Sequence, residues 1–218
     1  EAGADGPMKI LVLGGGAQGR VIAADLAGSL PHAQVTVLDL KRPPLPALPN
    51  LQWLEGDGSD PEAIARRLRE HDLGVGALPS ALGFGAMRAA IAAGRNLVDV
   101  SFTAEDPLSL DAEARAAGVT IAPDCGLAPG LSNLLLGQAV HARGTPRAAT
   151  IMVGGVAEDP TRPYGYVVTW SLDDLMEEYT RPARIVRDGE ETSVPVVSGL
   201  ERVRVGWVGE MEAVYSDG

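Results

Sequence analysis

The chain has 218 residues, of which 45% are hydrophobic, enough to bury one large core or two modest ones without cross-links. Its formal net charge of -11 argues against nucleic acids and anionic membrane surfaces as partners, because both would repel it. The single cysteine, Cys125, excludes an internal disulfide, and the three histidines lack metal-ligand spacing, so we expect no metal site.

The sequence also lacks membrane and export signals. No apolar run approaches the ~20 residues that span a bilayer, and residues 1–7 have neither the basic start nor the apolar middle of a signal peptide. We therefore expect a cytoplasmic protein that acts on small molecules. Because Met8 directly opens the first strand pattern, we expect it to be the native first residue.

Strand-like apolar runs alternate with helical patterns as far as Pro123, which predicts right-handed crossovers onto one parallel sheet. The last two helices should end at Gly94 and Gly118, since glycine closes a helix without a Cβ penalty. Four prolines in residues 41–50 predict an extended loop in place of one helix. The expected strands are 9–13, 34–40, 51–55, 74–78, 96–101 and 119–123, and the expected helices 21–30, 61–71, 81–93 and 107–117.

After Asn133 the pattern changes, because strands follow strands. One more helix should run to about Ala142, and a short helix capped by Ser171 should follow. The pairs Asp188-Gly189 and Gly209-Glu210 predict hairpin turns. The expected strands lie within 149–156, 164–170, 183–191, 202–210 and 211–218. We therefore predict a doubly wound Rossmann domain, 8–128, and a second α+β domain on a mixed sheet, 129–218. Because the sequence stops at Gly218 just after a strand and a turn, we expect the second domain to be incomplete and the chain to be a fragment.

A glycine-rich segment follows the first strand. Gly14, Gly16 and Gly19 have G-x-G-x-x-G spacing, with Ala17 and Gln18 between them. Such glycines allow a tight turn, close approach of a pyrophosphate and close helix packing, and the helix N-terminus favours phosphate. The motif alone also occurs in ordinary turns.

An acidic residue ends the second strand, twenty residues after Gly19. Asp39, followed by Leu40, is placed to bind the adenosine ribose hydroxyls, and its charge favours NAD over NADP. Lys41 and Arg42 leave NADP open, because they could bind its extra phosphate. After the third strand, Asp57 and Gly58 are expected beside the adenine, although this segment also suits a helix-capping loop.

The segments "GALPS", "LVDVS", "APDCGLAPGLSN" and "TWSLDDLMEEYTRPARIVRDG" resemble the saccharopine dehydrogenase superfamily, especially its L-lysine 6-dehydrogenase-like branch. The most specific of these is the D-x-G-x-x-P-G-x-x-N run at 124–133. The resemblance implies a nicotinamide cofactor on the first domain and an amino-acid substrate between the domains. Members of this family are usually longer than this chain, which agrees with a fragment.

Candidate catalytic groups lie at strand ends, because ligands of open parallel sheets bind beyond the carboxyl ends of the strands. Leu78 and Pro79 end the fourth strand and are expected at the nicotinamide, as is Ser101 after the fifth. Asp124 is the leading candidate for the base and Asp99 the second. Structural aspartates bonded to backbone would give the same pattern. Cys125 fits a small buried hydrophobe better than a nucleophile.

Substrate contacts are expected near the start of the second domain. Pro129 and Gly130 should begin a helix that binds a carboxylate, with Asn133 on the same end, although simple helix initiation explains them equally well. Arg181 and Tyr179 are further candidates, with solvated helix-end residues as the alternative.

The function implied is NAD-dependent oxidation of the lysine ε-amine to the 6-semialdehyde. The alternatives are a saccharopine or carboxyspermidine-type dehydrogenase that reduces an imine, and a nucleotide-binding module without chemistry. We expect a homodimer formed through the sheet of the second domain.

Overall fold

The computed structural model describes residues 6–157, 159, 167–168, 171–206 and 208–217. Within it the chain divides into two compact units, Glu1–Leu131 and Ser132–Gly218.

The first unit is built on a six-stranded sheet with the order β3-β2-β1-β4-β5-β6, in which every pairing is parallel. The reversal of strand order beside β1 defines a doubly wound, Rossmann-like fold, which confirms the predicted fold class. The strands are β1 Lys9–Leu13, β2 Gln34–Asp39, β3 Leu51–Glu55, β4 Leu73–Gly76, β5 Asn96–Asp99 and β6 Ile121–Ala122.

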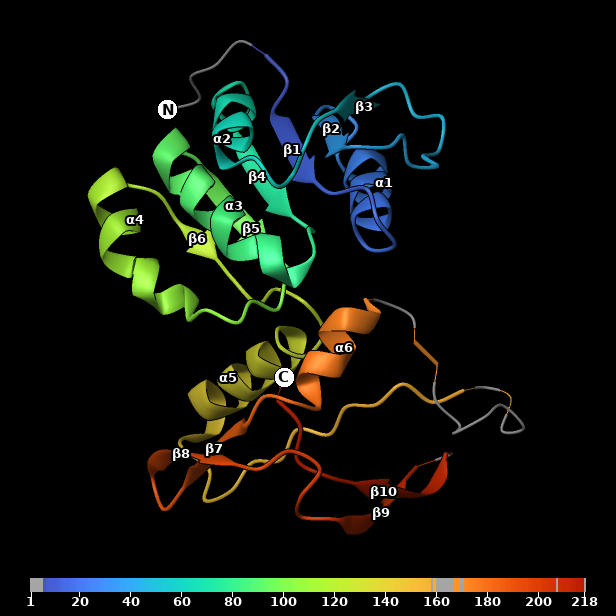
Figure 1. Cartoon of the computed structure of the whole chain (residues 1–218), viewed down its shortest axis with the longest axis vertical. Coiled ribbons are helices and arrows are strands. Elements are labelled where there is room, and N and C mark those ends of the chain that lie inside the picture. Colours follow the sequence, from blue (N-terminus) through green and yellow to red (C-terminus); the bar gives the residue numbers. More distant parts are fainter. Residues whose placement is uncertain (1–5, 158, 160–166, 169–170, 207, 218) are drawn as a thin grey trace. The chain divides into compact units, whose positions relative to one another are not determined.

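Helices cover both faces of this sheet (Figure 1). Alternate residues of β1 point to opposite sides: Leu11 and Leu13 pack in one buried cluster with α2, α3 and α4, whereas Ile10 and Val12 pack in a second cluster with α1. Each face therefore has its own hydrophobic core. The helices are α1 Gly19–Ser29, α2 Pro61–Arg69, α3 Ser80–Ala93, the 3-10 helix η1 Pro107–Leu110 and α4 Asp111–Ala117.

Local sequence signals fix where these helices begin and end. Asp60 caps α2, since its side chain accepts hydrogen bonds from the backbone N–H groups of Glu62 at 2.9 Å and Ala63 at 3.1 Å. Helices α3 and α4 end at Gly94 and Gly118, both left-handed, with φ values of 67° and 66°. Both predicted glycine stops are confirmed.

The crossover between β2 and β3 contains neither helix nor strand, as its prolines predicted. Leu45 and Leu48 pack against the core on the α1 side and so replace the missing helix. At the end of the crossover, the side-chain amide of Asn50 donates to the carbonyl oxygens of Ala27, Leu30 and Ala33 at 3.0, 3.2 and 3.0 Å. One side chain thereby satisfies carbonyl groups where α1 ends.

The second unit contains two helices and two separate antiparallel strand pairs among its described residues, where the sequence predicted one mixed sheet. Pairing between β7 and β8 closes at Asp188 and Gly189, both with positive φ, which confirms that turn. Ser171 caps α6 through a 3.3 Å hydrogen bond from the N–H of Asp174. The elements are α5 Leu131–Arg143, α6 Leu172–Glu178, β7 Ala183–Arg187, β8 Glu190–Val194, β9 Glu201–Val205 and β10 Gly209–Ala213.

Two further predictions for this unit need correction. Residues 149–155 form no strand, because two adjacent glycines, Gly154 and Gly155, weaken strand structure and most of the segment is exposed. The turn expected at Gly209-Glu210 lies earlier in the chain, because Gly206 and Val208 are turn residues and Gly209 already pairs with Val205 in the ladder. Most of the strand expected at 164–170 lies outside the described residues.

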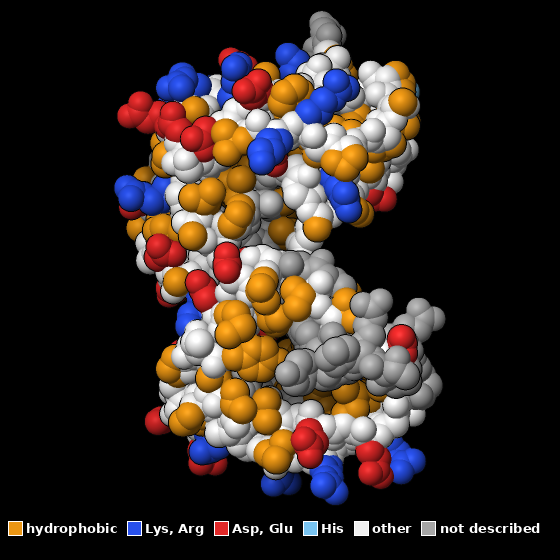
Figure 2. All heavy atoms as spheres, turned by 45° about the vertical axis from the view of Figure 1, so that its right-hand side comes forward, with side chains coloured by type: hydrophobic (Ala, Val, Ile, Leu, Met, Phe, Trp, Pro, Cys, Tyr) orange, Lys and Arg blue, Asp and Glu red, His pale blue; other side chains and the backbone are white. Residues whose placement is uncertain are grey.

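On the face drawn in Figure 2, charged side chains of both signs lie among hydrophobic ones over the first unit. Over the second unit a group of hydrophobic side chains lies above charged side chains at the lower end. Helix α5 has no buried residue, and its Leu134 and Leu135 are 61% and 56% exposed. In the part of the chain that the structure describes, no helix combines the length and apolar character needed to cross a bilayer.

Candidate dinucleotide-binding and catalytic site

The ends of all six strands meet at one edge of the sheet, which is where the sequence placed the ligand. Hydrogen bonds beyond the ladder hold neighbouring strand ends together, so the loops after all six strands start side by side. In each of these bonds a backbone N–H donates to a backbone carbonyl oxygen. The pairs are Gly14 to Leu38 at 2.8 Å, Gly56 to Asp39 at 3.2 Å, Ala77 to Leu13 at 2.8 Å, Val100 to Gly76 at 3.1 Å and Cys125 to Asp99 at 2.8 Å.

The three motif glycines after β1 have three different environments. A Cβ added at Gly14, where φ is +93°, would lie 2.6 Å from the carbonyl oxygen of Ala77, so this position needs glycine for its turn. A Cβ at Gly19 would collide with the carbonyl oxygen of Gly14, so this glycine brings α1 against the strand. A Cβ at Gly16 would meet nothing within 4 Å. Neither packing nor strain in the protein explains that glycine, whereas a ligand at the loop would.

The loop leads directly into the N-terminus of α1. Gly16, Ala17 and Gln18 are exposed, and Gln18, the N-cap, makes no side-chain capping hydrogen bond. The first turn of α1 also contains no acidic residue. The positive end of the helix dipole is therefore left for an anion from outside the helix.

Asp39 lies at the end of β2, directly beside this loop. Its Oδ2 accepts a hydrogen bond from the N–H of Gly15 at 2.7 Å, and its Oδ1 accepts one from the N–H of Lys41 at 2.9 Å. Leu40 is 62% exposed, and the indole N–H of Trp53 donates to the Asp39 carbonyl oxygen at 3.2 Å. The acid predicted to bind the ribose therefore lies beside the glycine loop and contacts it.

The loops after β3 and β4 contact one another. A Cβ at Gly58 would lie 2.6 Å from Cδ2 of Leu78, so these two residues pack together. Asp57 is exposed, and hydrogen bonds from the Ser59 side chain and backbone lower its pKa. Pro79 is exposed at the N-cap of α3. The residues expected around the adenine and nicotinamide therefore line the same edge as the glycine loop.

Asp99 is the most deeply buried carboxylate in the described part of the chain, with 0% exposure. Its Oδ1 accepts hydrogen bonds from both the N–H and the hydroxyl of Ser101. Burial raises the pKa of Asp99 above its usual value, the Ser101 hydrogen bonds oppose that rise, and the charge of Asp124 adds to it. These contacts favour a structural role for Asp99 over a role as the catalytic base.

Two glycines outside the predicted motif create the space for this cluster. A Cβ at Gly76 would overlap the carboxylate of Asp99, and one at Gly83 would overlap the hydroxyl of Ser101. Ser80, at the start of α3, is also buried. The sequence contained one signal for this cluster, the glycine within the helical pattern of α3, because a glycine inside a helix commonly marks close packing.

Asp124 differs from Asp99 in exposure and backbone conformation. It is half-buried and left-handed, with a φ of 54°. Desolvation raises the pKa of the neighbouring Cys125 thiol, and the charges of Asp124 and Asp99 raise it further. Cys125 is exposed, so its predicted burial is wrong, but a raised pKa lowers its thiolate fraction and leaves it poorly suited to act as a nucleophile.

The specific run after Asp124 forms a tight loop. A Cβ at Gly130 would overlap the backbone of Gly126, and the N–H of Leu131 donates to the Gly126 carbonyl at 2.9 Å. The sequence predicted that Pro129 and Gly130 begin a helix, but helix α5 begins at Leu131, so both residues precede it. Position 130 needs glycine because its backbone approaches the backbone of Gly126 closely.

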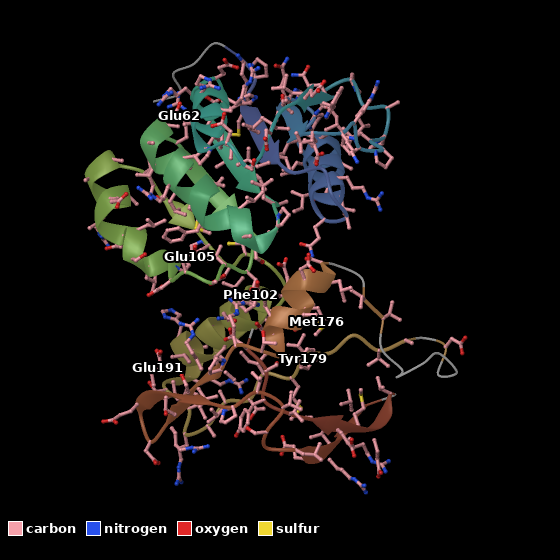
Figure 3. The ribbon with its side chains drawn as sticks, in the orientation of Figure 1. Glu62, Phe102, Glu105, Met176, Tyr179 and Glu191 are labelled. Carbon is pink, nitrogen blue, oxygen red and sulfur yellow. The ribbon has the colours of Figure 1, made fainter. Side chains whose placement is uncertain are left out.

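The remaining substrate candidates belong to the second unit. Asn133 is exposed on α5, where its Oδ1 accepts from the Ser132 hydroxyl at 2.9 Å. Arg181 forms ion pairs with Glu177 at 3.7 Å and Asp217 at 3.3 Å. Tyr179, at the end of α6, is 39% exposed (Figure 3). Across the described residues, no group of three or more His, Cys, Asp or Glu side chains is placed to hold a metal.

The raised pKa of Asp99 predicts a pH-dependent stability. The neutral acid is favoured in the folded state, so its contribution is complete below the unfolded pKa of about 3.9 and is lost as pH rises through the raised folded pKa. We expect the free energy of unfolding of the parent to fall relative to Asp99→Asn over this range, by about 1.4 kcal/mol for each tenfold difference in proton affinity between the folded and unfolded states. Urea unfolding of both proteins at a series of pH values measures this.

Asp57→Asn is the control with the opposite sign. Because its pKa is lowered, the contribution of Asp57 is present above the unfolded pKa and lost as pH falls. A difference between the parent and Asp99→Asn that does not change with pH would show that the buried carboxyl is not favoured in its neutral form.

These features define a class of protein: an open α/β sheet with a glycine loop, an uncapped helix N-terminus and an acid at the end of β2 is a dinucleotide-binding fold. The family model described as the saccharopine dehydrogenase NADP binding domain matches residues 10–122, and the model described as the saccharopine dehydrogenase C-terminal domain matches residues 126–217. The chain therefore belongs to the saccharopine dehydrogenase family.

Curated relatives and a solved structure agree with this assignment. The chain is 27% identical over 144 residues to the saccharopine dehydrogenase (NADP(+), L-glutamate-forming) of Pyricularia oryzae, which is 63% of this chain and 32% of that protein. It is 22% identical over 167 residues to the alpha-aminoadipic semialdehyde synthase of Arabidopsis thaliana, 73% of this chain and 16% of that protein. Apo saccharopine dehydrogenase (L-Glu forming) from Saccharomyces cerevisiae shares the fold, with a TM-score of 0.68 and 19% identity over 95% of this chain and 49% of that chain.

The chain thus spans about a third of the curated Pyricularia relative and about half of the solved yeast chain.

Proposed function

We propose that the chain is part of a nicotinamide-dependent oxidoreductase that acts on the CH–NH2 or CH–NH group of an amino acid. The observation that carries this proposal is Gly16, whose missing side chain nothing in the protein requires, in a chain whose first unit matches an NADP binding domain. In this proposal residues 8–128 hold the cofactor, and residues 129–218 contribute to substrate binding and to a homodimer through their strands. We further propose that the protein is cytoplasmic.

The cofactor would lie along the edge where the strand ends meet. The pyrophosphate would lie over the glycine loop and the N-terminus of α1, the adenosine ribose at Asp39, and the nicotinamide near the end of β4. The residues proposed to contact it are Gly14, Gly16, Ala17, Gln18, Gly19, Asp39, Leu40, Asp57, Gly58, Leu78 and Pro79.

The chemistry requires the protein to accept a proton from the substrate amine. An alkyl ammonium group with a pKa near ~10.4 cannot release hydride from the adjacent carbon until it is deprotonated. We propose Asp124 as the base, because it is a half-buried carboxylate at a strand end, whereas Asp99 is enclosed and bonded to Ser101. A nicotinamide held there would supply the hydride acceptor, and water would hydrolyse the substrate imine.

Two substrates follow from this chemistry. With L-lysine, oxidation at Cε and hydrolysis release ammonia and the 6-semialdehyde, which is the reaction that the motif resemblance implies. Saccharopine is the second candidate, because curated relatives carry the name saccharopine dehydrogenase (NADP(+), L-glutamate-forming). Ser101, Pro129, Gly130, Asn133 and Arg181 are the proposed substrate contacts.

The test is a reduced-cofactor formation assay of the complete gene product with L-lysine, saccharopine and related amines, with each oxidised cofactor. Ammonia release with lysine supports the first substrate, and glutamate release with saccharopine supports the second. Tight cofactor binding without turnover of any of these amines would contradict the proposed enzyme activity and favour a nucleotide-binding module without chemistry.

We predict that the chain binds NAD more tightly than NADP, because the charge of Asp39 would repel the extra phosphate. Replacing Asp39 with alanine should reduce the preference for NAD over NADP, since Lys41 and Arg42 remain nearby and could bind the extra phosphate of NADP. Tryptophan fluorescence titration measures both affinities, and Trp53, bonded to the Asp39 carbonyl, is a suitable reporter. Equal affinities, or a preference for NADP, would refute the role given to Asp39.

A further inference from the structure

The carboxylate of Asp39 is tied to two separate loops. Its Oδ2 accepts from the N–H of Gly15, within the glycine loop, at 2.7 Å, and its Oδ1 accepts from the N–H of Lys41, at the start of the crossover, at 2.9 Å. Hydrogen bonds to a charged acceptor are stronger than those between neutral groups. Asp39 therefore fixes the glycine loop in the protein without any ligand.

The neighbours of Gly15 leave this N–H few alternatives. Gly15 is buried, and a Cβ there would lie 2.7 Å from Cγ of Pro43 and 3.2 Å from Cγ1 of Val37. A buried backbone N–H that loses its acceptor carries the full cost of its desolvation. Without the Asp39 carboxylate, the loop at Gly15 would have to shift to reach another acceptor or water.

The same carboxylate retains capacity for a ligand. Each carboxylate oxygen has two acceptor positions, and one on each is used by a backbone N–H. The remaining positions can accept the adenosine ribose hydroxyls. The carboxylate can thus hold the loop and bind the ribose at the same time.

We propose that Asp39 is a positioning residue for the pyrophosphate loop in addition to a ribose ligand, so that binding of the phosphate part of the cofactor depends on it. This inference rests on the proposed cofactor site. It separates Asp39 from an acid that only selects between NAD and NADP, because such an acid would leave phosphate binding unchanged.

The binding test uses an NAD analogue whose adenosine ribose lacks both hydroxyl groups, so that direct ribose contacts are removed. By calorimetry, Asp39→Ala should weaken binding of the analogue about tenfold, as expected for the loss of the hydrogen bond that holds Gly15 of the glycine loop to a charged acceptor. The affinity of Asp39→Asn for the analogue should lie between those of the parent and Asp39→Ala, because the single carbonyl oxygen of asparagine can replace only one of the two carboxylate oxygens. Unchanged affinity of both variants for the analogue would overturn the proposal.

Asp72→Ala is the matched control. Asp72 also accepts a backbone hydrogen bond, from the N–H of Lys9 at 2.8 Å, but it precedes β4, at the opposite edge of the sheet from the glycine loop. It should leave the affinity for the analogue within about twofold. A loss equal to that of Asp39→Ala would show a general effect of destabilisation and overturn the specific role.

Hydrogen exchange of the Gly15 amide in the ligand-free protein gives an independent readout. The parent should protect this amide, and Asp39→Ala should accelerate its exchange by roughly tenfold or more while core amides of β1 remain protected. Equal exchange in both proteins would overturn the positioning role. If the parent bound no dinucleotide, the proposed function would fail, and this measurement would still decide whether Asp39 holds the loop.

Discussion

Replacing Gly16 with valine should abolish dinucleotide binding and leave the chain folded. A Cβ at this position meets nothing within 4 Å, and Gly16 is exposed, so the protein has room for the new side chain. The pyrophosphate would need that same space to approach the loop backbone. Calorimetry with NAD should show no detectable binding, and circular dichroism should match the parent.

Gly19→Ala is the contrasting variant at the same loop. Its Cβ would overlap the carbonyl oxygen of Gly14, so α1 would have to move away from the strand, and we expect a lower thermal midpoint. The two variants therefore distinguish a glycine that the ligand requires, at position 16, from a glycine that packing of the protein requires, at position 19. If Gly16→Val binds NAD like the parent, the loop is only a turn and the proposed cofactor site is wrong.

Replacing Asp124 with asparagine should lower turnover of the complete gene product by roughly 10²–10⁴, the usual contribution of a positioned proton acceptor. NAD affinity should stay within a few-fold, because the groups proposed to hold the phosphates and ribose lie on other loops. Asparagine is the suitable replacement, since Asp124 has a φ of 54° and asparagine tolerates the left-handed region. Steady-state kinetics with the preferred amine measures the effect.

The pH profile and a parallel variant identify the role. Without a base, residual activity should rise toward pH ~10 as free amine deprotonates, whereas the parent should level off earlier. Asp99→Asn should mainly raise the half-saturating amine concentration if Asp99 is an anchor, and depress saturated turnover if it is the base. Normal turnover and an unchanged profile for Asp124→Asn would exclude Asp124 and leave Asp99 or a bound water.

Most of the first unit could be predicted because its signals are local. Strand and helix patterns alternate, and Gly94 and Gly118 end their helices where the sequence placed them. Spacing alone also identified the glycine loop. It could not distinguish Gly14 and Gly19, which packing requires, from Gly16, which it does not, because that difference depends on residues distant in sequence such as Ala77.

The sequence could not predict which of the two aspartates is buried, or how the strands of the second unit pair. Asp99 and Asp124 look equivalent as acids after strands, and only the contacts with Gly76 and Ser101 show that Asp99 is enclosed. In the second unit, the local turn at Asp188-Gly189 was readable, whereas the turn near Gly209 depended on the register of β9 with β10. Short strands whose partners are distant or absent carry little signal of their own.

The strand order of the first unit also bears on how it folds. Four of its five pairings join residues 16 to 25 positions apart, but β1 and β4 pair Ile10 with Leu73, 63 positions apart. Closing that longer segment costs more chain entropy, so the halves β3-β2-β1 and β4-β5-β6 should assemble before they join. The proposed cofactor crevice lies at this junction. A dinucleotide that bridges it would favour the pairing that forms last, and so slow the separation of the two halves.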